Sequence, residues 1–175
     1  MTEPAWYAAF ATAATVLAVA GLAKTVRPHD TARALRAGGW PTRPWMVRAG
    51  GAAEAIIGLA AVLAGGRLAA ALLAVSYAAL ATFVAAALVR QTPLSSCGCF
   101  GEPDTPPTVL HVLVDAGLAA AGYMAFVHPL RGLPAMVSAD PSHGLVLTAL
   151  VGLAAYAVIT ALTAVPRLTA IGAPR

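Results

Sequence analysis

Charged side chains are scarce in this chain of 175 residues. Only 10% of the residues are Asp, Glu, Lys or Arg, whereas 59% are hydrophobic. A soluble globular domain of this length needs more charge to cover its surface, so the composition excludes that class and predicts a membrane protein. The net charge of +4 is then a signal of membrane topology, and we expect no nucleic-acid partner.

A secretory signal is also missing from the first residues. Met1-Thr2-Glu3-Pro4 has no positively charged segment, which such a signal needs before its apolar run. We therefore expect the first apolar run to be retained as a helix.

Long apolar runs dominate the rest of the chain. Four runs, and a fifth near the end, have roughly 18–23 residues, enough to cross a hydrocarbon core about 30 Å thick. Their Ala, Leu, Val and Gly texture indicates helices, which satisfy their own backbone polar groups in lipid. The predicted fold is an all-α, polytopic transmembrane helical bundle with a four-helix core, a fifth span and one short interfacial helix. The expected spans are residues 5–23, 46–64, 68–89, 109–127 and 144–165.

The polar stretch after the first span contains the predicted interfacial helix, residues 29–37. Asp30 or Thr31 could cap its start, and Gly38-Gly39 would stop it. Trp40 and Trp45 are typical of anchors at the level of the lipid headgroups.

Proline and glycine predict the remaining connections. Gly65-Gly66-Arg67 is expected to form a tight turn, and residues 90–108 and 128–143 are expected to be loops because prolines interrupt both. Pro166 is expected to end the fifth span, before a short basic tail. The predicted division is a four-helix membrane domain over residues 1–127 and a second part over residues 128–175.

Basic residues are distributed unevenly between the two sides of this topology. The positive-inside rule therefore predicts that the loop of residues 90–108 faces the cytoplasm. Nine basic residues fall on that side, Lys24, Arg27, Arg33, Arg36, Arg43, Arg48, Arg90, Arg167 and Arg175, against Arg67 and Arg131 on the other.

Cysteine is nearly absent, and its two copies stand together. Cys97 and Cys99 are separated only by Gly98, in a loop punctuated by proline and glycine. Two adjacent thiols can form a disulfide, share a metal ion or exchange electrons with another thiol pair. The one-residue spacing would close a small, strained ring, which favours a labile and oxidising disulfide, and Gly98 supplies the backbone freedom for it.

The second span contains a carboxylate, Glu54. It lies roughly 12 Å from the basic end of the span at 1.5 Å per residue, where burial costs about 2.5–3.5 kcal/mol on insertion scales. Such a residue faces the bundle and has either a structural partner or a chemical task, such as carrying a proton. Gly50 and Gly58 share its face and would let a neighbouring helix approach.

Three further ionisable residues fall in the same half of the membrane as Glu54 and the cysteines. His111 and Asp115 are four residues apart on one face of the fourth span, which continues through Leu118 and Gly122. They could cap the helix start or act in catalysis. Lys24, at the end of the first span, would by itself be a lysine that extends to the headgroups.

These residues give the chain a resemblance to the MauE/DoxX-type redox-associated membrane proteins, and within them to the methylamine-utilisation MauE branch. The matching motifs are Gly21-Leu22-Ala23-Lys24, Glu54 with Gly58, and Cys97-Gly98-Cys99-Phe100-Gly101. They cover residues 5–127. Val114-Asp115 departs from a pattern in which many members carry a basic residue beside Asn or Asp.

The resemblance implies a multi-pass protein of the bacterial plasma membrane that is associated with maturation of methylamine dehydrogenase and acts with a thioredoxin-like partner. It implies that Cys97 and Cys99 are the redox pair, and it assigns Lys24 and Glu54 to motif positions without a known role.

Three functions therefore stay open. The first is a thiol–disulfide relay, in which Glu54 or Asp115 could receive the proton. The second is binding or transport of a soft metal by Cys97 and Cys99, with His111 as a third ligand, although a stable tetrahedral site needs more ligands than this. The third is a non-catalytic assembly subunit. The residues leave open whether a quinone takes part, and they do not decide the oligomeric state.

Overall fold

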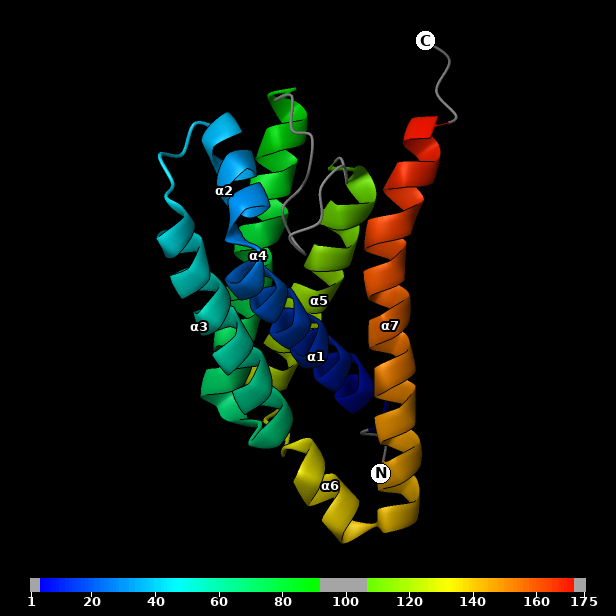
Figure 1. The fold of residues 1–175 in the computed structure, drawn as a ribbon. Helices are drawn as coiled ribbons and strands as arrows, with labels where there is room; N and C mark the ends of the chain where they lie inside the picture. The colour runs from blue at the N-terminus through cyan, green and yellow to red at the C-terminus, as the bar shows by residue number, and fades with distance from the viewer. Residues whose placement is uncertain (1–3, 92–106, 172–175) are drawn as a thin grey trace.

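The computed structural model describes the backbone of residues 4–91 and 107–171, and the side chains of residues 6–91 and 107–165. Every regular element within these ranges is a helix, which confirms the predicted all-α class (Figure 1). The helices are α1 (Pro4–Val26), α2 (Pro28–Ala37), α3 (Pro44–Leu63), α4 (Gly66–Val89), α5 (Val109–Val127), α6 (Leu133–Ala139) and α7 (Pro141–Ile171).

Five of the described helices, α1, α3, α4, α5 and α7, are long and apolar enough to cross a membrane. The predicted polytopic bundle is therefore confirmed, including its fifth span. In Figure 1, α1 begins and α7 ends at opposite ends of the bundle, as an odd number of crossings requires.

Helix α1 forms the centre of the bundle. Its apolar window is 61% buried, whereas the windows of the other four spans are 17–28% buried. Phe10 and Leu17 of α1 are fully enclosed by the core, and Tyr77 of α4 donates a buried hydrogen bond of 2.7 Å to the carbonyl of Ala13. The other four spans thus each contact α1 on one side and face lipid on the other.

Small residues bring α1 and α3 into close contact. A side chain at Gly58 would meet the carbonyl oxygen of Ala14 and the backbone nitrogen of Ala18, each at 2.6 Å. Nearer the end of α1, Gly51 lies against the backbone of Gly21 in the same manner. The backbones of α1 and α3 are therefore in direct contact, and van der Waals packing holds the two helices together.

A second close contact closes the opposite end of the bundle. Gly65 adopts φ +68°, and Gly66 donates a 2.9 Å hydrogen bond to the carbonyl of Leu130, just after α5. Gly132 packs directly on the backbone of Leu63. A tight turn is present, but one residue earlier than predicted: it is formed by Ala64 and Gly65, because Gly66 and Arg67 already belong to α4. It attaches the α3–α4 connection to the chain beyond α5.

The short helix after the first span is present, but its predicted cap is wrong. Helix α2 starts at Pro28, where proline's fixed φ suits the first turn, and its N-cap residue is Arg27. Asp30 lies inside the first turn and pairs with Arg33 instead, at 2.9 Å. Gly38 follows the last turn, as expected.

Two predictions about the C-terminal part are also wrong. Residues 128–143 are not one loop, because Pro134 and Pro141 each stand in a first helical turn, of α6 and α7, where proline is tolerated. Helix α7 continues through Pro166 to Ile171, since one missing donor does not stop a membrane helix.

Asp140 defines the start of α7. Its carboxylate accepts hydrogen bonds from the Ser142 hydroxyl and the His143 backbone, and its other oxygen contacts the His143 ring at 2.7 Å. These hydrogen bonds, that of Ser142 first, lower the pKa of Asp140 to about 2. The cap therefore stays ionised at any physiological pH.

We expect Gly58→Ala to destabilise the protein by about 1–3 kcal/mol, because the added methyl group forces the α1 and α3 backbones apart. Gly50→Ala is the matched control on the same helix, since a side chain there meets no atom within 4 Å. Thermal unfolding in detergent, followed by circular dichroism, measures both. Equal melting temperatures for the two variants would contradict the close packing described here.

Candidate functional site

A buried ion pair joins the first two spans. Lys24 Nζ donates to Glu54 Oε2 at 2.5 Å, and the two side chains are only 5% and 21% exposed. Lys24 is in the last turn of α1, whereas Glu54 lies in the middle of α3. The pair is possible because Gly21 and Gly51 let the two backbones approach at this point.

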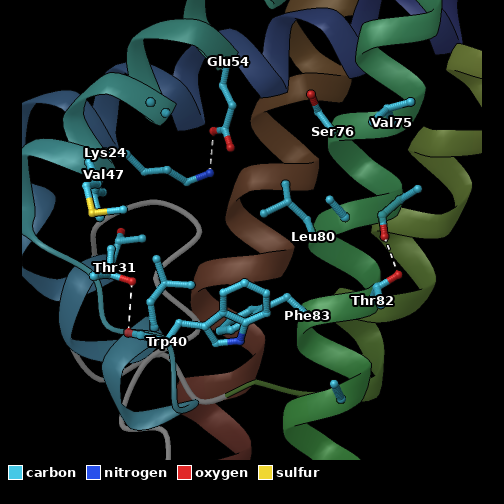
Figure 2. A pocket seen from close by; sticks show the side chains of 18 of the residues that line it. Lys24, Thr31, Trp40, Val47, Glu54, Val75, Ser76, Leu80, Thr82 and Phe83 are labelled. Atoms are coloured by element: carbon cyan, nitrogen blue, oxygen red, sulfur yellow. Dashed lines mark hydrogen bonds and ion pairs between the residues drawn. The ribbon is translucent and has the colours of Figure 1, made fainter.

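This geometry resolves two expectations. Glu54 has the partner that its depth in an apolar span requires. The interpretation of Lys24 as a lysine extending to the headgroups is wrong, because its side chain turns inward to the carboxylate (Figure 2). Each charge compensates the burial of the other, so neither is tolerated well alone.

The small-residue face of α3 differs from the predicted one. The small residues buried on α3 are Gly51, Ala55, Gly58 and Ala61, whereas a side chain at Gly50 would enter open space. Glu54 therefore lies at the edge of the α1 contact and not at its centre. One side of its carboxylate meets Lys24, and the remainder is accessible.

The accessible side of Glu54 faces a groove of about 1120 Å³ (Figure 2). Helices α3 and α4 form its two walls, and α2 with the α2–α3 connection forms its floor. Its lining is largely aliphatic and aromatic. The lining residues are Lys24, Thr31, Leu35, Trp40, Thr42, Met46, Val47, Gly50, Gly51, Glu54, Val75, Ser76, Ala78, Ala79, Leu80, Thr82, Phe83, Ala86 and Arg90.

The groove contains functional candidates that the sequence analysis missed. Ser76 and Thr82 donate to carbonyls of their own helix, at 2.8 and 2.7 Å, so their hydroxyl oxygens can still accept a hydrogen bond. Trp40 and Phe83 add aromatic surface at the end of the groove away from Glu54 (Figure 2). The sequence signal that could have indicated these residues is the occurrence of Ser76, Thr82 and Phe83 in the otherwise Ala- and Leu-rich span α4.

His111 and Asp115 lie on the buried face of α5, with 0% and 4% exposure, and Gly122 continues that face. His111 completes a capping box with Thr108, whose hydroxyl lies 3.0 Å from Nδ1. The capping interpretation of His111 is thus confirmed. Neither residue is among those that line the groove. Of the predicted site residues that the structure describes, Lys24 and Glu54 are the two that lie at the groove.

Cys97 and Cys99 lie outside the described residues, and their pairing stays a prediction. Among the residues that the structure does describe, no three His, Cys, Asp or Glu side chains gather in a group that could hold a metal ion.

The fold and the site define a class: a polytopic α-helical membrane protein with an ion pair buried between two spans and a lateral groove beside it. The chain belongs to the MauE family, because the sequence profile described as "Methylamine utilisation protein MauE" matches residues 1–130. This region ends after α5, so α6 and α7 lie beyond it. No curated protein and no solved structure matches the chain.

We expect Lys24→Met to lower the free energy of unfolding by roughly 3 kcal/mol, because it leaves the Glu54 carboxylate buried without its partner. The double variant Lys24→Met/Glu54→Met should recover much of this loss. Arg33→Met, which breaks the exposed pair with Asp30, is the matched control and should cost less than about 1 kcal/mol. Thermal melts of these three variants and the wild type measure the losses, and a double variant that is as unstable as Lys24→Met, or less stable, would refute the coupling.

Proposed function

We propose that this protein is an integral membrane thiol–disulfide redox protein, in which Cys97 and Cys99 exchange electrons with a thioredoxin-like partner. One observation carries the proposal. The chain has only two cysteines, they are separated by one residue, and they fall within the part that matches the MauE family. An apolar protein that used cysteine only for packing would place it in its helices.

The proposed step is a thiol–disulfide exchange. One thiolate of the pair attacks a disulfide sulfur of the partner and forms a mixed disulfide, releasing one partner thiolate. The second cysteine of the pair then attacks the first cysteine's sulfur in the mixed disulfide. This forms the Cys97–Cys99 disulfide and releases the second partner thiolate. Overall, Cys97 and Cys99 lose two electrons and two protons, and the partner disulfide gains them. The same steps run in reverse when the partner is the reductant.

Family membership supports a wider role. The family is named for methylamine utilisation, and we propose that the chain supports maturation of methylamine dehydrogenase or of another disulfide-containing protein in a bacterial plasma membrane. Lys24 and Glu54 would hold the bundle in shape for this task, and Asp115 or Glu54 would carry the proton.

The charge distribution supports an orientation with residues 90–108 on the cytoplasmic side. Arg27 lies between α1 and α2, Arg33 lies within α2, and Arg43 directly precedes α3. Arg90 directly follows α4, at the same end of the bundle. Arg67 and Arg131 flank the contact at the opposite end. In a reducing cytoplasm the disulfide would be transient and catalytic.

The first experiment traps the exchange. In membranes of cells that express Cys97→Ser or Cys99→Ser, the variant that keeps the attacking thiol should accumulate a covalent adduct with a thioredoxin-like protein, because the resolving thiol is gone. Non-reducing electrophoresis and mass spectrometry identify the adduct, and Cys97→Ser/Cys99→Ser is the control without thiols.

Two other outcomes would overturn the relay. Metal bound in stoichiometric amount to the purified protein, and lost in both single variants, would favour the soft-metal function. Absence of any adduct, together with full function of the double variant, would favour a non-catalytic assembly subunit.

A second experiment tests the orientation. A membrane-impermeant thiol reagent should fail to label Cys97 and Cys99 in intact cells, and should label them after the cells are opened. Ser142→Cys in the Cys97→Ser/Cys99→Ser background is the matched reporter, because Ser142 is exposed in the first turn of α7 at the opposite end of the bundle. Rapid labelling of the wild type in intact cells would reverse the assignment.

A further inference from the structure

The groove beside Glu54 opens towards lipid. It runs along α4, a candidate membrane span, and two of the residues that line it there, Val75 and Ala79, are exposed, Val75 by 66%. An exposed position on a membrane span faces hydrocarbon. A ligand can therefore enter from the bilayer without crossing water, and the largely apolar walls suit a lipid-soluble molecule.

The polar end of the groove limits what that molecule can be. Lys24 and Glu54 compensate each other's charge, and the carboxylate is the more accessible partner, 21% against 5% exposed. An anionic lipid headgroup would therefore meet a carboxylate before it met the ammonium group. A neutral head that can both accept and donate hydrogen bonds suits the pair better, since Lys24 only donates and an ionised Glu54 only accepts.

The shape of the lining favours a flat head. Ala78 and Ala79 keep the α4 wall low between the ion pair and the aromatic rings of Trp40 and Phe83, which lie at the far end of the groove (Figure 2). Aromatic and small side chains together accommodate a planar ring better than a branched headgroup. The volume of about 1120 Å³ leaves room for a ring and the first part of an apolar chain.

We propose that this groove binds the head of a lipid-soluble quinone. In its oxidised form a ring carbonyl accepts a hydrogen bond from Lys24 Nζ. In its reduced form a ring hydroxyl donates to the Glu54 carboxylate, and the apolar chain leaves along α4 between the two walls. The side-by-side donor and acceptor thus serve both redox forms of one ligand.

The binding site follows from the groove, whereas its use rests on the proposed function. Oxidation of the Cys97 and Cys99 dithiol to a disulfide releases two electrons and two protons. Reduction of one quinone to a quinol consumes the same two electrons and two protons, so the step balances without a further reactant. Lys24 and Glu54 are then the residues that hold the ring.

Tryptophan fluorescence tests the binding, because a bound quinone quenches a nearby indole. Trp6→Phe/Trp45→Phe leaves Trp40 as the single reporter in the groove. This protein, in nanodiscs of phosphatidylcholine, is titrated with a short-chain ubiquinone. Trp40→Phe/Trp45→Phe leaves Trp6, which lines a separate small pocket between the start of α1 and the end of α5. We expect saturable quenching of Trp40 and only a linear, unsaturable decrease for Trp6.

A filling substitution locates the site. The larger side chain of Ala79→Leu would fill part of the groove. It should raise the quinone concentration that gives half-maximal quenching by about tenfold or more, as expected for a modest steric clash. Ala53→Leu is the matched control, because Ala53 is exposed on α3 but does not line the groove. Ala53→Leu should leave the quinone concentration at half-maximal quenching unchanged.

Several results would overturn the quinone site: linear quenching of Trp40, equal shifts in the two leucine variants, or displacement of the quinone by stoichiometric phosphatidylglycerol, which would make the groove a phospholipid site. The Cys97→Ser/Cys99→Ser variant separates this proposal from the proposed function. Saturable binding in that variant, together with no mixed disulfide in the single variants, would refute the thiol relay and leave the site standing. A mixed disulfide in a single variant, without saturable quinone binding, would support the thiol relay and refute the quinone site.

Discussion

The contact between α1 and α3 is the constraint on which the site depends. Gly21, Gly51 and Gly58 have no side chains, so the two backbones approach closely and Lys24 comes within hydrogen-bonding distance of Glu54. A bulkier residue at any of these positions would separate the helices. The ion pair would then be lost, and each charge would remain in a medium that solvates it poorly.

The same contact explains why a groove exists beside the pair. Because α3 packs chiefly on α1, and α4 chiefly on α5, the two helices α3 and α4 leave between them a groove that residues of both helices line. The opening between them reaches Glu54 and is bounded below by Trp40. A carboxylate that would be fully enclosed in a tighter bundle is therefore accessible from one side, and this accessibility gives the site its chemical interest.

Much of the fold could be predicted from the sequence because it depends on local composition. Apolar runs of membrane-spanning length place the helices, and Gly38 and Gly65 place two of the breaks. The errors in the C-terminal part have a common cause. Prolines are expected to interrupt residues 128–143, whereas Pro134 stands in the first turn of α6 and Pro141 begins α7. A proline's effect depends on its position within a turn, which composition does not specify.

The candidate site was only partly predictable. The sequence by itself determined that Glu54 needs a partner, because a carboxylate in an apolar span is costly to leave alone. It also predicts Cys97 and Cys99 as the redox pair. Only the tertiary structure decided that the partner is Lys24 and that a groove adjoins the pair. Thirty residues separate Lys24 from Glu54, and no local pattern encodes which helix faces they share, since that is settled by how closely the small residues let whole helices pack.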